Sequence, residues 1–329
     1  MLDPLYTAAE MRAAEARYPG FPDTAPDLMD RAGRAVATEV ATRYPDAHFI
    51  AAVCGRGSNG GDGRIAAEIL RGLGRETLIV EPGGTLGPCD LVVDALFGTG
   101  FEGEPREPAA RLIAAINAAG VPVVSVDVPS GVDASTGEVA GAAVDADLTV
   151  TFHAPKVGLY VAPGRFHAGA ITVVDIGLTD EDTVHRLVRA DVLAQVPHRS
   201  AGDNKYSAGS VLVVGGAPGT SGAVCLTAAA ALRADAGYVT VCAPSEILPV
   251  VEAQLLEPVK RPLEEAFEAA GRAHALAVGP GLGRDRKELV RRLLAEVDLP
   301  AVVDADALFE FEPAERSAST VLTPHEGEL

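Results

Sequence analysis

The sequence contains no tryptophan and no run of about 18 uncharged apolar residues of the kind that spans a membrane. Its first 15 residues lack the positively charged start of a signal peptide and carry acidic residues early. With 48% hydrophobic and 22% charged residues, the composition is typical of a soluble globular enzyme. We therefore expect a cytoplasmic protein that is not inserted in a membrane.

Basic residues are scarce. The sequence has 27 lysines and arginines against 46 aspartates and glutamates, which leaves a formal net charge of −19. A sequence-independent nucleic-acid binder needs a basic face to neutralise phosphates, so that class is excluded. An anionic ligand must be held by backbone N–H groups and a few local cations.

Cysteine is also rare, and the four cysteines lie far apart at Cys54, Cys89, Cys225 and Cys242. Such isolated residues favour reduced thiols over a disulfide framework or a zinc site. Two of them, Cys54 and Cys242, fall inside strand-like runs, which predicts that they are buried.

The length of 329 residues favours two domains. Apolar runs alternate with helical segments, which predicts buried, mostly parallel sheets covered on both faces. We place a first domain at residues 1–178, a polar linker at 179–200 and a second domain at 201–329. The predicted strands are Phe49–Cys54, Thr77–Val80, Leu91–Asp94, Val121–Val126, Leu148–Thr151, Ala170–Val174, Ser210–Gly216, Tyr238–Cys242, Ala275–Val278 and Pro300–Val303.

The most informative stretch is the glycine-rich segment Gly55–Gly63, between the strand Phe49–Cys54 and a predicted helix Gly61–Leu73. Its glycines permit a tight turn and bring N–H groups close to an anion at a helix start. The spacing is only a weak match to dinucleotide fingerprints. Without other motifs, a phosphate site and a plain tight turn are both open.

Three further motifs follow predicted strands: 94–101 (DALFGTGF), 125–133 (SVDVPSGVD) and 151–158 (TFHAPKVG). The carboxyl ends of parallel strands lie at one edge of a sheet, where ligands of such sheets bind. Taken in order with 55–63, these motifs resemble the NAD(P)HX epimerase domain of the bifunctional NAD(P)HX repair enzymes. The resemblance implies a Rossmann-like three-layer α/β/α sandwich that epimerises the R and S forms of hydrated NAD(P)H.

The resemblance also implies roles for individual residues. Asp127 and Lys156 are the candidate acid/base residues; alone, the aspartate could instead be a turn cap and the lysine a phosphate ligand. A potassium ion is expected at Asn59, Asp94 and Ser130, whose oxygens suit a hard cation. His153 and His167 are expected to be surface or packing residues. The residues expected to bind the hydrated dinucleotide are Ser58, Asn59, Gly60, Gly61, Asp62, Gly98, Thr99, Gly100, Phe101, Glu102, Gly103, Glu104 and Asp127.

The second half resembles the NAD(P)HX dehydratase domain, which is ribokinase-like and uses ADP or ATP with Mg²⁺. The motifs are those at 205–216, 229–241, 279–283, 304–306 and 322–329. Ala223, Gly283 and His325 match the contacts of that family with the hydrated cofactor. The family continues with a Gly-x-Gly-Asp turn that this sequence does not contain. We therefore expect a partial ribokinase-like domain, either a fragment or one completed by another chain, and doubt its dehydratase activity.

Two rival interpretations remain. Related epimerase-like domains serve as non-catalytic scaffolds, and the second half alone could be a small-molecule kinase. The presence of Asn59, Asp94 and Asp127 together favours an enzyme acting on NAD(P)HX. The sequence leaves the oligomeric state open, including a homo-oligomer.

Overall fold

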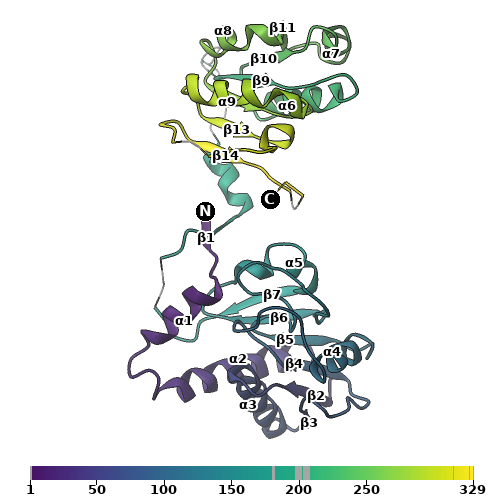
Figure 1. Cartoon of the computed structure of the whole chain (residues 1–329). Coiled ribbons are helices and arrows are strands. Elements are labelled where there is room, and N and C mark those ends of the chain that lie inside the picture. Colours follow the sequence, from purple (N-terminus) through teal and green to yellow (C-terminus); the bar gives the residue numbers. More distant parts are fainter. Residues whose placement is uncertain are drawn as a thin grey trace. The chain divides into compact units, whose positions relative to one another are not determined.

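The computed structural model describes residues 2–179, 182–196, 202, 208–313, 315–325 and 327–328 (Figure 1). The chain divides into two compact units, Met1–Gln195 and Val196–Leu329. Each unit is built on a six-stranded sheet whose neighbouring strands all run parallel. The α/β class with parallel sheets, predicted from the sequence, is confirmed.

The first sheet has the order β3-β2-β4-β5-β6-β7. The first strand of this sheet along the chain is the inner strand β2. The next strand, β3, lies on one side of β2, and the chain then crosses back so that β4 lies on the other side. The crossing leaves a crevice outside the carboxyl ends of β2 and β4, the usual ligand position in such sheets. The strands are β2 (Phe49–Cys54), β3 (Glu76–Val80), β4 (Leu91–Ala95), β5 (Val123–Val126), β6 (Leu148–Phe152) and β7 (Ala170–Val174).

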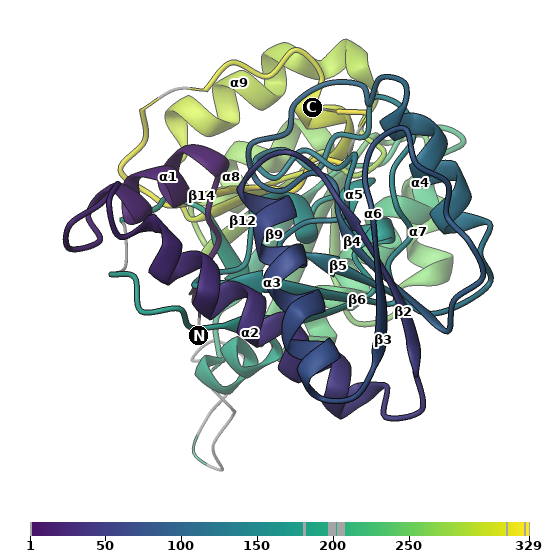
Figure 2. The same cartoon turned by 90° about the horizontal axis from the view of Figure 1, so that it is seen from below.

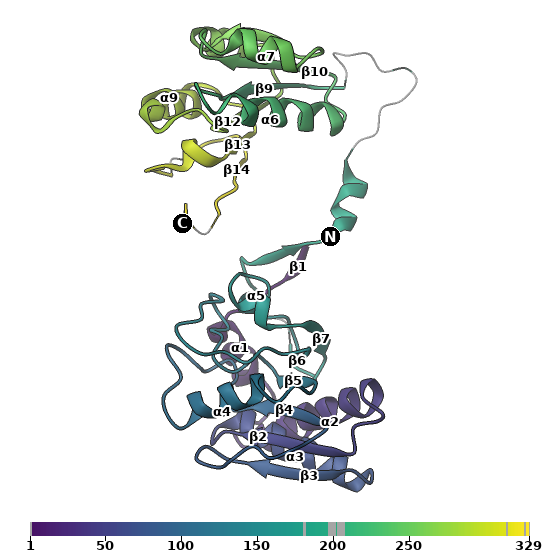
Figure 3. The same ribbon diagram turned by 90° about the vertical axis from the view of Figure 1, so that its right-hand side faces the viewer.

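Helices cover both faces of this sheet (Figure 3). α2 (Ala25–Arg43) and α3 (Ser58–Gly72) pack on one face, and α4 (Ala109–Asn117) packs on the other. α2 and α3 approach closely because Gly33 has no side chain: a Cβ there would lie 2.6 Å from Cβ of Ile65. The remaining helical segments are α1 (Ala8–Ala16), η1 (Val157–Leu159) and α5 (Gly164–His167).

The predicted linker at 179–200 is partly structured, which corrects the sequence-based boundary. β8 (Arg186–Val188) pairs antiparallel with β1 (Leu2–Pro4), and η2 (Ala190–Gln195) follows. Asp3 and Arg189 form an ion pair beside this pairing. These short strands expose most of their side chains and carry no apolar run, so their sequence contains no strand signal. Residues 180, 181 and 197–200 of the predicted linker lie outside the described residues.

The second sheet has the order β11-β10-β9-β12-β13-β14, so its crossing point lies between β9 and β12. α6 (Ser221–Arg233) and α7 (Leu248–Gln254) pack on one face, and α8 (Ala266–Ala270) and α9 (Lys287–Glu296) on the other (Figure 2). The strands are β9 (Ser210–Val214), β10 (Tyr238–Ala243), β11 (Val259–Pro262), β12 (Ala275–Val278), β13 (Ala301–Val303) and β14 (Thr320–Leu322). Short 3₁₀ segments are η3 (Leu263–Glu265), η4 (Arg284–Arg286) and η5 (Ala305–Leu308).

Most predicted elements are present with small shifts of their ends. Phe49–Cys54 and Ala170–Val174 have the predicted bounds, whereas β11, β14, α7 and α8 were not predicted. α3 begins at Ser58, three residues before the predicted start at Gly61. Cys54 and Cys242 are buried as expected, and burial raises the pKa of their thiols to about 11 and about 12. Within the described residues, no helix combines the length and apolarity needed to cross a bilayer.

Candidate functional site

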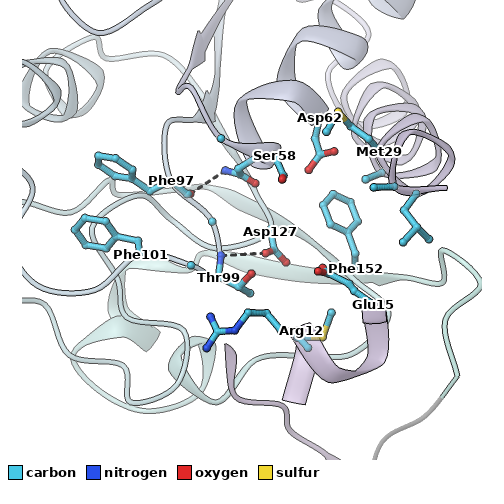
Figure 4. Close-up of a pocket in the computed structure, with 18 of the residues that line it drawn as sticks. Arg12, Glu15, Met29, Ser58, Asp62, Phe97, Thr99, Phe101, Asp127 and Phe152 are labelled. Atoms are coloured by element: carbon cyan, nitrogen blue, oxygen red, sulfur yellow. Dashed lines mark hydrogen bonds between the residues drawn. The ribbon is translucent and has the colours of Figure 1, made fainter. Parts of the chain in front are cut away.

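A cavity of about 770 Å³ lies at the carboxyl edge of the first sheet, beside the crossing point between β2 and β4 (Figure 4). All four sequence motifs contribute to it: the start of α3, the loop after β4, Asp127 after β5 and Phe152 at the end of β6. The opposite side is formed by Met11, Arg12 and Glu15 of α1 and by the first turns of α2. The ring of Phe152 forms part of the cavity wall.

The glycine-rich segment forms the first turns of α3 instead of a long loop. Gly57 is the N-cap, and the first intrahelical bond runs from the Gly61 N–H to the Gly57 carbonyl at 3.2 Å. The N–H groups of the preceding residues therefore have no partner within the helix and are available to an anion. Ser58 and Asn59 line the cavity as predicted.

Gly60 and Gly61 are predicted binding residues that the structure gives another role. A Cβ on Gly60 would lie 2.0 Å from the Gly55 carbonyl oxygen, and one on Gly61 would lie 2.4 Å from Sδ of Met29. Gly60 lets the first turn of α3 lie against the Gly55 backbone, and Gly61 lets α2 pack closely against α3. Neither glycine lines the cavity. By contrast, Gly57 lines the cavity and a Cβ there would meet no atom within 4 Å.

The loop after β4 supplies the neighbouring side of the cavity. Residues 98–102 line it, whereas Gly103 and Glu104, also predicted to bind the ligand, do not. Phe97 and Phe101 stack with ring centroids 4.5 Å apart and stiffen the loop. The Thr99 N–H donates to Oδ2 of Asp127 at 3.3 Å, which ties this loop to the end of β5.

Asp127 is held at the cavity by a buried network. Its Oδ1 lies 2.6 Å from the Lys156 ammonium and accepts a hydrogen bond from the Thr151 hydroxyl at 3.1 Å. Asp127 also has a φ of +66°, a left-handed conformation that is uncommon for residues with a side chain and is adopted more readily by aspartate than by most. The carboxylate thus combines a fixed position with access to the cavity.

Lys156 is fully buried and does not line the cavity. Besides Asp127, its ammonium donates to the Thr151 hydroxyl and to the Phe152 carbonyl, each at 2.8 Å. Three partners use all three of its protons. Lys156 is therefore a positioning residue for Asp127, and the predicted direct catalytic contact with substrate is not available to it in this arrangement.

Two further carboxyl groups face the same space as Asp127: Asp62 of α3 and Glu15 of α1 (Figure 4). Burial, followed by the negative charges of Asp127 and Glu15, raises the pKa of Asp62 to about 8. Burial and Asp127 also raise the pKa of Glu15, while Lys156 and Arg12 lower it. Asp62 is thus protonated at neutral pH, a property that its sequence neighbours alone do not reveal.

The three predicted potassium ligands meet beneath the cavity. Asp94 is completely buried, and its carboxyl accepts from the Ser130 hydroxyl at 2.6 Å and from the Ser125 hydroxyl at 2.8 Å. Burial raises the pKa of Asp94, whereas these hydrogen bonds lower it. Asn59 comes to the same place through a hydrogen bond from its side-chain amide to the Phe97 carbonyl at 2.8 Å.

The oxygen atoms gathered at this place are of the kinds that bind a monovalent cation. They belong to one buried carboxylate and to hydroxyl, amide and carbonyl groups, which are ligands of hard cations. Phe97 was missed in the sequence because a main-chain carbonyl has no residue-type signal. No group of three His, Cys, Asp or Glu side chains suited to a metal occurs in the described part of the chain.

In the second unit, the three predicted cofactor contacts follow different strands. Ala223 lies in the first turn of α6 after β9, Gly283 follows β12, and His325 follows β14. Gly281, two residues before Gly283, approaches the first turn of α6: a Cβ on Gly281 would lie 3.1 Å from Cβ of Ala223. His325 is largely exposed and pairs with Glu328, and no contact brings it to the other two.

Comparison with known proteins gives matches in both units. Residues 25–82 and 73–158 match the family model described as YjeF-related protein N-terminus, and residues 211–329 match the model for NAD(P)H-hydrate dehydratase. The bifunctional NAD(P)H-hydrate repair enzyme Nnr of Coxiella burnetii is 36% identical over 92% of this chain and 70% of its own length. The enzyme of that name from Mycobacterium tuberculosis H37Rv is 37% identical over 98% of this chain and 74% of its own.

Among solved structures, the ADP/ATP-dependent NAD(P)H-hydrate dehydratase from Bacillus subtilis, co-crystallised with ATP and Mg²⁺, is 28% identical. The match covers 42% of this chain and 51% of that one, with a TM-score of 0.37.

The raised pKa of Asp62 predicts how stability depends on pH. From pH 3.8, which equals the ordinary pKa of an aspartate, up to about pH 8, Asp62 holds a proton in the folded state and has released it in the unfolded state. This carboxyl group therefore makes the protein less stable as pH rises through that range. Asp62→Asn removes the titration and should gain stability relative to the parent between pH 5 and pH 9, by a few kcal/mol in total. Thermal melting across this range measures the difference. Glu68→Gln, on the exposed face of α3, should track the parent; parallel curves for Asp62→Asn and parent would contradict the assignment.

Proposed function

The chain belongs to the family of bifunctional NAD(P)H-hydrate repair enzymes, and we propose that its first unit interconverts the two configurations of hydrated NADH and NADPH. The observation that carries this proposal is the buried Asp127–Lys156 pair, which presents one carboxylate to the cavity at the sheet's carboxyl edge. Because its carboxylate lines the cavity and is not sealed in the core, the pair favours an enzyme over a scaffold. We assign residues 1–178 to the epimerase domain and 201–329 to the dehydratase domain.

The cavity suits a dinucleotide whose negative charge is held without many cations. N–H groups at the start of α3 and in the loop 98–102 face the pyrophosphate, and Arg56 adds one cation beside them. The hydrated ring then lies near Asp127 and the Phe152 ring, in the less exposed part of the cavity. This orientation keeps phosphates away from the carboxyl groups of Glu15 and Asp62.

In this proposal Asp127 is the general acid/base of the epimerisation. It approaches the substrate hydroxyl or the water that replaces it, and its charge is balanced by Lys156. The Thr151 hydroxyl and the Thr99 N–H fix its two oxygens, so little reorganisation accompanies the step. The role of Lys156 is to hold and balance this carboxylate.

We further propose that Asn59, Asp94, Ser130 and the Phe97 carbonyl hold a potassium ion. Asp94 is a buried carboxylate whose partners in the described chain are neutral donors, and a cation would balance its charge. A bound ion would also join the start of α3 to the ends of β4 and β5. Its role is structural support of the cavity.

For the second unit we propose the dehydratase role of the family, with ADP or ATP and Mg²⁺ as cofactors. Its support is the family match over residues 211–329. Ala223 and Gly283 lie at the crossing point of the second sheet, where a ligand of such a sheet binds. A cytoplasmic location remains our expectation, because free thiols suit a reducing compartment.

Asp127→Asn tests the epimerase assignment. The amide is nearly isosteric but cannot exchange a proton, so the rate should fall about 100- to 10,000-fold while ligand affinity changes little. Asp133→Asn is the matched control, because Asp133 only accepts turn hydrogen bonds from the N–H groups of Ser135 and Thr136. Chromatographic separation of the two hydrate configurations measures the rate. A fully active Asp127→Asn enzyme would move the chemistry to another group.

Gly57→Val tests the anion site. A valine side chain fits at this position without a clash, so the protein should still fold. Its methyl groups cover the free N–H groups of α3, and affinity for NADPH should therefore fall at least about tenfold. Gly72→Val, at the exposed end of the same helix, also meets no atom within 4 Å and should bind normally. Titration calorimetry compares the two. Equal affinities would place the pyrophosphate elsewhere.

Asn59→Ala tests the ion site. Removing one ligand should raise the potassium concentration needed for half-maximal epimerisation by about tenfold or more. The measurement is the epimerisation rate against potassium at constant ionic strength, with sodium or choline as replacement. Identical potassium curves for parent and variant would remove the metal assignment.

A further inference from the structure

Three carboxyl groups from three separate elements point into the inner part of the cavity, around the Phe152 ring (Figure 4). They are Glu15 of α1, Asp62 of α3 and Asp127 after β5. Each of these negative charges opposes the ionisation of its neighbours: Asp127 and Glu15 raise the pKa of Asp62, and Asp127 raises the pKa of Glu15. In a partly dry site the groups therefore divide into charged and neutral ones. Which group keeps the proton depends on its neighbours.

The surroundings of Asp62 and Asp127 differ in one decisive way. Asp127 has a direct cationic partner in Lys156 and two hydrogen-bond donors besides. Asp62 is only 8% exposed, and within the described residues its carboxyl has neither an ion-pair partner nor a hydrogen-bond donor. A buried acid without a partner keeps its proton, and its pKa is raised to about 8.

We propose that Asp62 is a second catalytic residue of the epimerisation, the proton donor that works with Asp127 from the other side of the hydrated ring. This inference rests on the proposed epimerase function and deepens it. Asp62 projects from α3 and Asp127 from the end of β5, so a ring held between them presents one face to each. Inversion by loss of water from one face and addition of water to the other uses a proton donor on the first face and a proton acceptor on the second.

The chemistry balances without an oxidant, a reductant or a further reactant. The hydroxyl was added to an enamine double bond, so it sits on the carbon bonded to the ring nitrogen. The C–O bond breaks with its electron pair on oxygen, the oxygen takes the Asp62 proton and leaves as water, and the nitrogen lone pair forms a C=N bond. Water then bonds to the opposite face, the pair returns to nitrogen, and the surplus proton goes to Asp127.

One turnover therefore moves a proton from Asp62 to Asp127, and the reverse conversion uses the same steps backwards. Exchange with solvent through the open cavity restores the starting protonation. Burial and Asp127 raise the pKa of Glu15 as well, but Lys156 and Arg12 partly offset that effect, whereas no cation among the described residues offsets it at Asp62. The role therefore falls to Asp62. The charged groups around the cavity that bear on this titration are Arg12, Glu15, Arg56, Glu102, Asp127 and, behind it, Lys156.

The test is the pH profile of kcat/KM for epimerisation between pH 5.5 and 10, started from each separated hydrate configuration. The variants are Asp62→Asn, Asp62→Glu and the control Glu68→Gln. In the parent, kcat/KM should fall about tenfold per pH unit above about 8, as the Asp62 proton is lost. Asp62→Asn should lower kcat about 100- to 10,000-fold in both directions, abolish the alkaline fall and leave the Kd for NADPH within about threefold.

Asp62→Glu keeps a carboxyl group and should retain the alkaline fall with part of the rate, an outcome that a purely structural role would not produce. Glu68→Gln should match the parent throughout. An Asp62→Asn enzyme with kcat within about threefold of the parent, or a parent profile that stays flat to pH 9.5, would overturn the inference and leave the proposed function standing. A parent that does not epimerise at all would overturn both.

Discussion

The buried ion pair between Lys156 and Asp127 is the interaction on which the first unit's site depends. Removing both charges from water is costly, and hydrogen bonds offset part of the cost: all three Lys156 protons have acceptors, and each Asp127 oxygen accepts a hydrogen bond. Lys156 reaches Thr151 and Phe152 as well as Asp127, which joins the ends of β5 and β6. The backbone around Lys156 also pairs with the N-terminal segment. Tyr6 forms a parallel β-bridge with Lys156, and the Val157 N–H donates to the Tyr6 carbonyl. The pair therefore sets the position of both Asp127 and the segment that leads into α1, which closes the cavity.

The second constraint is the crossing point of each sheet. In the first unit, β2 and β4 are paired to their carboxyl ends, and the connections that follow them lead to opposite faces of the sheet. The start of α3 and the loop after β4 supply the free N–H groups there. In the second unit, the connections after β9 and β12 diverge in the same way, and Ala223 lies near Gly281. Two different strand orders thus produce sites of the same kind, because the ligand position follows from parallel connectivity and not from a particular residue.

Charge explains the remaining features of the cavity. A chain with a net charge of −19 must bind an anionic dinucleotide. It does so in our proposal with N–H dipoles, with Arg56 and with acidic groups that are balanced or neutral. Lys156 balances Asp127, and burial keeps a proton on Asp62. The same burial that destabilises the ionised form of Asp62 also provides the proton that the reaction uses.

The sequence by itself determined most strands of the two sheets and the strand-end positions of Asp94, Asp127 and Ser130, because alternation of apolar runs and turn residues is a property of near neighbours. It also predicted that the glycine-rich turn leads into a helix, although that helix begins at Ser58 and not at Gly61. Only the tertiary structure decided that α1 lines the cavity, that Gly60 and Gly61 serve packing, that the Phe97 carbonyl accepts a hydrogen bond from Asn59, and that β1 pairs with β8. It likewise decided that Lys156 is enclosed while Asp62 stays protonated. Desolvation and through-space charge depend on groups distant along the chain, and no local pattern records which of them will meet.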